Sequence, residues 1–289
     1  MWVFLALVCA FLVATSAAFS KIALRRHDEY FVGFLRLAVS SPFLLLLLFL
    51  PDIPQPDVRY FKVVAFLVPL DIISYVLYNK AIKNSPLSLT MPFMSLTPVF
   101  LLLTGFLILG EKVGLIGSIG ISLVVFGAYI IKIEVFRYGV FAPIRAIYRE
   151  KGVLYMIAVA FIYSITAALG KKAIGYSSPI YFSATYFPIV AISSIPIILI
   201  RYKASVKRSN FRKIDIWLFL LIGVAFAASM VSHSFAITMT KAAYMITVKR
   251  MSMLFGVIYG WLLFKEGHIL NRLLGAALMI LGVLLVSLG

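Results

Sequence analysis

Four charged residues stand inside long apolar runs of the 289-residue sequence: Arg36, Asp71, Lys249 and Arg250. Placing one such charge at the centre of a helix in hydrocarbon costs about 2.5–3.5 kcal/mol, so each is a candidate functional residue. Lys249 and Arg250 are neighbours, and they offer a compact ammonium beside a guanidinium that can bind two oxygens at once. This pair predicts an anion-binding site. The alternative is that both side chains extend to the membrane surface or pair with a structural carboxylate.

Asp71 and Arg36 each have a functional and a structural interpretation. Asp71 follows Pro69, which loosens a helix locally, so its carboxylate could be a protonatable coupling site. It could equally be the counter-ion of Arg36 or Arg250. Arg36 lies nearer the end of its apolar run, from where its side chain could line the same site or reach the membrane surface.

Several uncharged polar residues are further candidates for the same site. His233 is flanked by two serines, and a histidine among small residues packs helices together more often than it relays protons. Tyr75, Tyr78 and Asn79 continue the face of Asp71 at helical spacing. They are predicted either to line the pathway or to pack against neighbouring helices.

The composition indicates what kind of structure must position these residues. Apolar residues make up 63% of the chain and charged residues 13%, with a mean hydropathy of +1.07. Average soluble domains are about 45–50% apolar and about 25% charged, so a soluble globular enzyme is excluded. Residues 43–50 are apolar at every position, which fits a helix but not a transmembrane barrel strand. The sequence therefore predicts an all-α polytopic membrane protein.

The length accommodates roughly ten transmembrane helices at about 20 residues each. The hydrophobic runs between charges and prolines place these spans at residues 2–24, 30–50, 61–81, 88–109, 113–133, 152–170, 179–200, 214–240, 243–264 and 270–288. The chain has a single cysteine and lacks an HExxH motif and paired intramembrane aspartates. We therefore expect no enzyme activity, no metal site and no cofactor.

Lysine and arginine are divided unequally between the two sets of loops. Ten spans put both termini on one side, and about 18 of the 27 Lys and Arg residues lie in loops of the opposite side. Because these residues accumulate in cytoplasmic loops, we predict a plasma-membrane protein with both termini outside. The net charge of +17 is then assigned to the membrane lipid surface and not to nucleic acid. Residues 134–151 are predicted to be a basic cytoplasmic linker, either an interfacial helix or a solvated segment.

The chain contains the same pattern twice. Residues 10–12 recur at 160–162, and a shift of 155 aligns the pairs Glu111 and Glu266, Gly105 and Gly260, Gly120 and Gly275, and Gly127 and Gly282. Each copy holds five spans, an odd number, so the second copy enters the membrane inverted. Residues 1–133 and 152–289 are therefore predicted to form two inverted five-helix repeats. This architecture is typical of secondary transporters that work by alternating access, with the site between the repeats.

The repeated glutamates and glycines have structural interpretations. Glu111 and Glu266 fall in tight turns at span ends, where a carboxylate favours the start of the next helix. Gly120, Gly127, Gly275 and Gly282 repeat at seven-residue spacing and allow close helix contact. That contact could join spans of one chain or of two chains, so a homodimer is a candidate assembly.

Three motifs of the first repeat resemble the EamA pattern of the drug/metabolite transporter superfamily. They are Tyr-Asn-Lys-Ala-Ile-Lys at 78–83, Thr-Pro-Val-Phe at 97–100 and Leu-Gly-Glu-Lys at 109–112, and the second repeat returns to them at 234–237 and 263–266. The resemblance covers both halves. It implies a ten-helix fold whose third, fourth, eighth and ninth spans line a central cavity. Members of the superfamily commonly start inside the cell, in contrast to the orientation that the charge count predicts.

The residues 247–250, Thr-Val-Lys-Arg, are also similar to the Lys–Arg pair in the ninth helix of plastid-type phosphate translocators. This resemblance implies that Lys249 and Arg250 hold an anionic head group. Those translocators add a lysine from the fourth helix, whereas the repeat-equivalent positions here hold Met94 and Ser95. Carboxylates and other organic anions therefore stay open beside phosphate.

These observations predict a secondary active transporter of a small organic anion, acting by exchange or by cation coupling. The first alternative is an efflux carrier for cationic or neutral amphiphiles or amino acids, with Asp71 as the exchange site. The second, from another class, is a membrane assembly protein that transports nothing; the intramembrane charges would then be unexplained.

Overall fold

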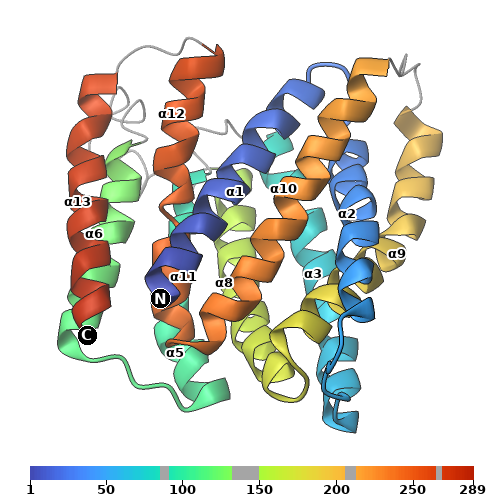
Figure 1. Ribbon diagram of the computed structural model, residues 1–289. Helices are drawn as coiled ribbons and strands as arrows, with labels where there is room; N and C mark the ends of the chain where they lie inside the picture. Colours follow the sequence, from blue (N-terminus) through green and yellow to red (C-terminus); the bar gives the residue numbers. More distant parts are fainter. Residues whose placement is uncertain (85–90, 132–149, 206–212, 265–268) are drawn as a thin grey trace.

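The chain folds into a bundle of helices. The computed structural model describes all residues except 85–90, 132–149, 206–212 and 265–268, and this described part contains no strand (Figure 1). Its elements are α1 (Trp2–Ala23), α2 (Glu29–Leu45), η1 (Leu46–Phe49), α3 (Val58–Asn84), η2 (Met91–Leu96), α5 (Thr97–Leu109), α6 (Leu115–Ile131), α8 (Lys151–Gly175), α9 (Pro179–Ser205), α10 (Lys213–Thr238), α11 (Ala242–Lys249), α12 (Ser252–Phe264) and α13 (Ile269–Leu288). The expected linker helix at 134–151 falls almost wholly outside the described residues.

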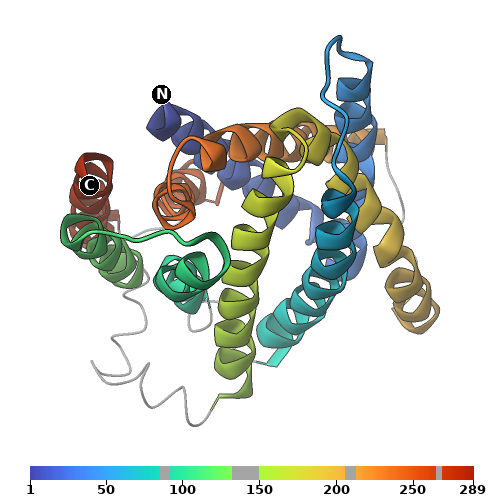
Figure 2. The ribbon, with the colours of Figure 1, turned by 90° about the horizontal axis from the view of Figure 1, so that it is seen from below.

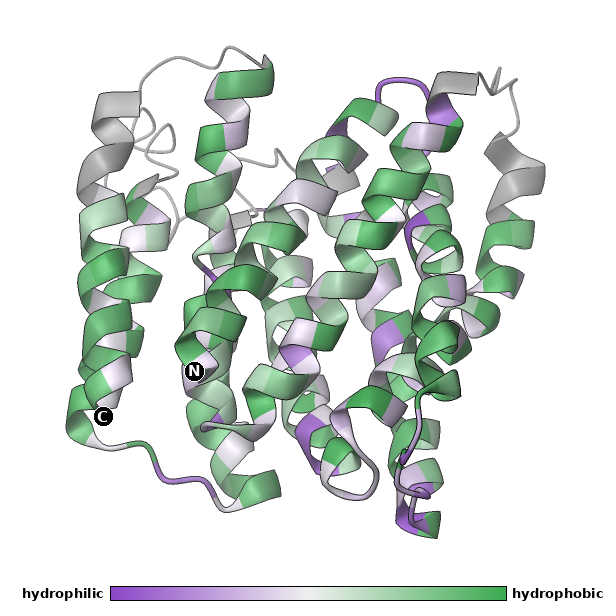
Figure 3. Cartoon of the chain, in the orientation of Figure 1, coloured by the Kyte–Doolittle hydropathy of each residue, from purple (hydrophilic) through white to green (hydrophobic). Residues whose placement is uncertain are grey.

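The helices have the length and apolarity that a membrane requires. Among the described residues, seven helical segments are long and apolar enough to span a bilayer, and the segments Phe93–Leu109, Leu115–Ile130 and Gly275–Leu288 are shorter apolar helices. Large apolar side chains such as Phe66, Leu107 and Trp217 are exposed on the outside of the bundle. Hydrophobic residues cover the helices along most of their length, while hydrophilic residues gather in connections and at a few interior positions (Figure 3). The outer surface therefore suits contact with lipid.

The closest helix pairs join the N-terminal and C-terminal halves of the chain. α1 packs along α10, α3 along α8, α2 along α9, and α6 along α13. Seen from below, α6 and α13 lie side by side at one end of the bundle, with α2, α3 and α9 at the other end (Figure 2). The two halves are thus interleaved, and the large interface between them runs through the whole molecule.

The glycines that repeat at seven-residue spacing mediate the contact between α6 and α13. A Cβ atom added at Gly120 would lie 2.7 Å from the carbonyl oxygen of Gly282, and one at Gly127 would lie 2.6 Å from that of Gly275. Only glycine allows the two backbones to approach this closely. The glycine faces therefore mediate a helix contact within one chain. The homodimer stays a prediction, but these glycines no longer support it.

Replacing Gly120 by alanine is expected to destabilise the protein by about 1–3 kcal/mol, because the new methyl group overpacks the α6–α13 contact. The measurement is the thermal unfolding midpoint of the purified protein in detergent. Gly256→Ala in α12 is the matched control, since nothing lies within 4 Å of a Cβ atom there. Equal midpoints for the two variants would contradict this account of the glycine contact.

Two of the expected spans are not continuous helices. The expected span 88–109 contains the 3-10 helix η2, and only from Thr97 onward the α-helix α5. Pro98 explains this break, because in a continuous α-helix its ring would clash with the carbonyl of Met94, and it has no N–H to donate. The expected span 243–264 ends as α11 at Lys249 and resumes as α12 at Ser252. No proline marks this second interruption, so the sequence pattern does not reveal it.

Candidate binding site

Arg250 joins the two interrupted helices. Its backbone N–H donates to the carbonyls of Ile246 and Thr247, which ends α11, and its Nη2 atom donates to Oγ1 of Thr97 over 2.7 Å. Thr97 is the first residue of α5. The half-buried guanidinium therefore spans from one interruption to the other, and its buried Nε atom has no hydrogen-bond partner among the described residues.

Lys249 is the last residue of α11 and points to a different neighbour. Its Nζ atom lies 3.5 Å from Nδ1 of His233 on α10, while Arg250 reaches α5. Carbonyl groups at the C-terminal end of a helix carry partial negative charge, which favours both cations at this place. From the end of α11, Lys249 thus points toward α10 and Arg250 toward α5, so the two cations lie between these helices without meeting at a single point.

Asp71, in the middle of α3, is hydrogen-bonded to neutral groups. The hydroxyl of Tyr186 on α9 donates to its Oδ2 atom over 2.5 Å, and Thr166 of α8 also interacts with the carboxylate. Within the described residues Asp71 forms no ion pair with Arg36 or Arg250, so the structure does not show the counter-ion pairing that was one of its two interpretations. It does interact electrostatically with Lys249.

Arg36 is turned toward the bundle interior and not toward the membrane surface. Its Cζ atom lies 4.9 Å from the ring centroid of Phe226 on α10, and it interacts electrostatically with Lys249 and Tyr78. Its buried Nε atom has no hydrogen-bond partner in the described part of the chain. The alternative in which Arg36 reaches the membrane surface is therefore not what the structure adopts.

The remaining candidates on α3 divide between packing and the interior. Tyr75 donates its hydroxyl hydrogen to the carbonyl of Tyr30 over 2.9 Å, and a Cβ atom at Gly33 would lie 2.9 Å from that hydroxyl. Tyr75 therefore packs α3 against α2. Tyr78 interacts electrostatically with Arg36 in the interior of the bundle. The side chain of Asn79 lies outside the described residues.

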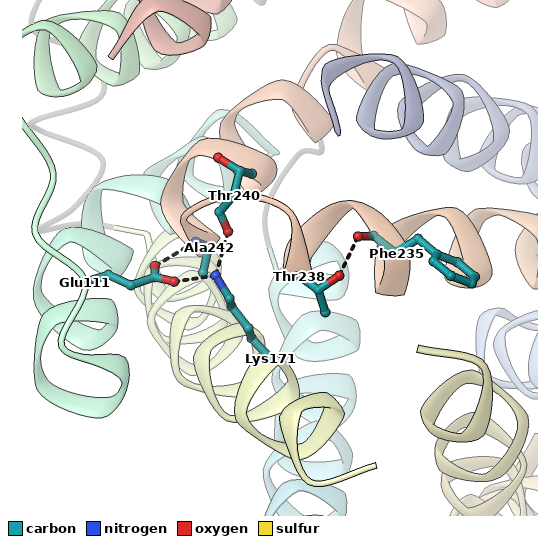
Figure 4. Close-up of polar contacts among 6 residues, drawn as sticks. All are labelled: Glu111, Lys171, Phe235, Thr238, Thr240 and Ala242. Atoms are coloured by element: carbon teal, nitrogen blue, oxygen red, sulfur yellow. Dashed lines mark hydrogen bonds and ion pairs between the residues drawn. The ribbon is translucent and has the colours of Figure 1, made fainter. Parts of the chain in front are cut away.

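A second polar cluster closes the face of the bundle that holds the turns 110–114 and 239–241, which we call the terminus face because both chain ends lie toward it (Figure 1). Lys171 of α8 donates to Oε1 of Glu111 over 2.5 Å and to the carbonyl of Thr240 over 2.6 Å. The backbone N–H of Ala242 donates to Oε2 of Glu111 over 2.7 Å. Figure 4 shows the carboxylate held between the ammonium and the start of α11. We call these four residues the Glu111 link.

Glu111 caps a helix, as the sequence predicts, but the helix is not the one expected. The capped helix is α11 of the other half and not α6, the next in sequence. Glu266, its repeat equivalent, lies outside the described residues. The glutamate therefore connects the two halves instead of stabilising one turn.

A third contact between the halves lies on the same face. The backbone N–H of Asp57 donates to the carbonyl of Tyr176 over 2.8 Å, and the guanidinium of Arg59 lies 4.6 Å from the Tyr176 ring centroid. Arg59 also donates to the Asp57 carboxylate, which lowers the pKa of Asp57 to about 2. The carboxylate is therefore charged throughout the physiological pH range.

Sequence reasoning missed Thr97, Thr166, Tyr186 and the role of Lys171. The first three are neutral residues whose importance comes only from a charged neighbour on another helix. A signal for Lys171 did exist, because it aligns with Lys21 in the repeat just as Glu111 aligns with Glu266. Each repeat therefore holds one lysine and one glutamate at equivalent positions, and these opposite charges suggest a salt bridge between the halves.

The comparisons with known proteins agree with this architecture. The sequence matches the EamA-like transporter family over residues 1–133 and 150–288, and the chain belongs to this family. It is therefore an integral membrane protein of a family of transporters and not of enzymes. A crystal structure of a protein with 13% sequence identity superposes with a TM-score of 0.76, covering 99% of this chain and 96% of that one, which shows a common fold. Among curated proteins none matches the sequence.

Proposed function

We propose that the protein is a secondary active transporter of a small organic anion. The observation that carries this proposal is the position of Lys249 and Arg250 at the interruption of α11 and α12, where Arg250 contacts the interruption before α5. Interrupted transmembrane helices form the substrate sites of many transporters, since their ends leave backbone groups and charges free to bind a ligand. Two half-buried cations at such a place favour a negatively charged cargo.

We further propose ten transmembrane helices arranged as two inverted repeats, residues 1–133 and 152–289, joined by the linker 134–151. The packing supports this division. If α8 is the repeat equivalent of α1, and α10 that of α3, then the α1–α10 contact has its counterpart in the α8–α3 contact. The pairs α2–α9 and α6–α13 each join two equivalent helices. Such a pattern is expected when a twofold axis in the membrane plane relates the halves.

In this mechanism the bound cargo replaces the contacts of Arg250 with Thr97 and of Lys249 with His233. An anion bound between α5 and α10 would accept hydrogen bonds from Arg250 and Lys249, in competition with Thr97 and His233. Alternating access also requires contacts between the halves to break on one face at a time. The Glu111 link closes the terminus face, and on the opposite face Arg26 lies 3.4 Å from Asp215 of α10.

The sign of the cargo's charge tests this proposal in the wild-type protein. Liposomes containing the purified protein are preloaded with one unlabelled compound, and uptake of the labelled compound is measured for carboxylates, inorganic phosphate, amino acids and a quaternary amine. We expect exchange of anions above that of protein-free liposomes, and none of the amine. Exchange of the amine without any anion would overturn the proposal in favour of a cation carrier.

The cation carrier is a second candidate because of one observation. Asp71 is a half-buried carboxylate at mid-helix whose hydrogen-bond donors are neutral, so a cation or a proton could bind it without breaking an ion pair. Lys249 interacts electrostatically with the same carboxylate and would oppose a cationic cargo. We therefore rank this function below anion transport.

We also propose a plasma-membrane location with both termini outside, which rests on the distribution of lysine and arginine. The native cysteine, Cys9, is buried. An exposed cysteine introduced at Gln55 should therefore be labelled by an impermeant reagent from outside the cell, and one at Asn84 should not. The reverse result would invert the orientation.

A further inference from the structure

One face of α10 holds two cations that come from different helices. Phe226 contacts the guanidinium of Arg36, and His233 lies 3.5 Å from the ammonium of Lys249. Seven residues separate Phe226 from His233, which is about 10.5 Å along a helix and only about 20° around it. Arg36 and Lys249 therefore stand on the same side of α10, about two helical turns apart.

Arg36 reaches this face because α2 and α10 pack unusually closely. A Cβ atom added at Gly223 of α10 would lie 2.6 Å from Cγ1 of Val39, so only glycine permits this approach. Val39 and Gly223 are each three residues from the contacting pair Arg36 and Phe226. The close contact thus positions the guanidinium over the aromatic ring.

Arg36 lacks the ionic partner that an arginine in a membrane protein normally has. In the part of the chain that the structure describes, it forms no salt bridge, and its buried Nε atom donates no hydrogen bond. A contact with an aromatic face is weaker than a charge-assisted hydrogen bond to a carboxylate. The side chain is therefore held against Phe226 without a charged partner among the described residues.

The formal charges of the described residues in this region do not balance. Arg36, Lys249 and Arg250 contribute three positive charges, and Asp71 contributes one negative charge that interacts with Lys249. Arg36 and Lys249 also repel each other. Two uncompensated positive charges in a low-dielectric interior are costly, and a ligand with two negative charges would remove this cost.

We propose that Arg36 is a second anion contact of the binding site, and that the cargo is an organic dianion with two separated acidic groups. One group binds Lys249 and Arg250, and the other binds Arg36 two turns away along α10. The inference rests on the proposed function and narrows its substrate class.

Linear dicarboxylates and monocarboxylates of equal chain length test the proposal, because each pair differs by one charge only. In liposomes containing the wild-type protein, we expect at least one dicarboxylate of four to eight carbons to have a KM about tenfold below that of its monocarboxylate. Arg36→Gln should raise the KM of this dicarboxylate about tenfold or more and change that of the monocarboxylate less than about twofold. Arg36→Lys should recover part of the difference, since it keeps the charge but loses the fork.

The ratio of the two KM values is the decisive readout, because a merely structural role of Arg36 would change both substrates alike. Lys172→Gln, which removes an exposed cation at the end of α8, is the matched control and should leave the ratio unchanged. Inorganic phosphate tests the other kind of dianion, in which both charges sit on one group.

The outcomes separate this inference from the proposed function. Exchange of anions with an unchanged ratio in Arg36→Gln would overturn the inference alone. Phosphate that binds more tightly than any dicarboxylate, and equally well in Arg36→Gln, would also overturn it. Absence of exchange for every anion would overturn the proposed function, and the inference with it.

Discussion

Lys249→Gln and Arg250→Gln are each expected to lower anion exchange about 100-fold. Each variant removes a charge-assisted hydrogen bond from a partly buried site, and a 100-fold loss corresponds to roughly 2.7 kcal/mol, within the range for such bonds. The measurement is kcat/KM for the anion that the wild-type protein exchanges best in liposomes. Lys62→Gln is the control, because Lys62 is an exposed cation near the start of α3.

Two further variants distinguish binding from packing at Arg250. Arg250→Lys keeps the charge but loses the second donor, so we expect an intermediate loss. Thr97→Val removes the acceptor of the Arg250 hydrogen bond without changing a charge. We expect kcat/KM to change less than about threefold, because the guanidinium can still donate its hydrogen bonds to the ligand. A loss in Thr97→Val as large as that in Arg250→Gln would show that the hydrogen bond between the halves matters, and not the cation.

Glu111→Ala is expected to cause the largest loss of stability. The carboxylate accepts hydrogen bonds from both Lys171 and the N–H of Ala242, so its removal leaves a largely buried ammonium without its counter-ion and the N–H of Ala242 without this acceptor. Breaking a buried ion pair on one side costs about 3–5 kcal/mol. Lys171→Met should cost less, because Glu111 keeps the hydrogen bond from Ala242. Thermal unfolding in detergent measures both effects, with Lys172→Met at the exposed neighbouring position as the control.

The charge swap Glu111→Lys with Lys171→Glu makes this prediction specific. It restores an ion pair but places an ammonium against the N–H of Ala242 and the positive end of α11, so we expect no recovery of the midpoint. Recovery to the wild-type midpoint would mean that Glu111 acts only as an ion-pair partner. In an alternating-access cycle, the same variants are expected to favour opening of the terminus face.

The intramembrane charges were found from the sequence alone, and the structure places Arg36, Asp71, Lys249 and Arg250 in one interior region of the bundle. The other three, Arg36, Asp71 and Arg250, each interact electrostatically with Lys249. The motifs at 78–83, 97–100 and 109–112 also identified the EamA family, which the family match over residues 1–133 and 150–288 confirms. The local sequence sufficed here because a charge in an apolar run is conspicuous at its own position.

The interruption at Lys249 was not predictable in the same way. The break before α5 has a local cause in Pro98, whereas residues 247–253 contain neither proline nor glycine. The backbone of Met251 and that of Leu254 donate to carbonyls three residues earlier, so the helix tightens without a residue that forces it. Contacts of Arg250 and Lys249 with α5 and α10 accompany this tightening, and no window of sequence contains those contacts.

What the sequence by itself determined is the class of protein, the approximate position of its membrane helices and the residues too costly to bury without a reason. These follow from the transfer energies and hydrogen-bonding needs of each segment, which are local properties of the chain. The tertiary structure alone decided which residues meet. Thr97 and Arg250 are 153 positions apart and Asp71 and Tyr186 are 115 apart, so only the packing of the two halves could bring each pair together.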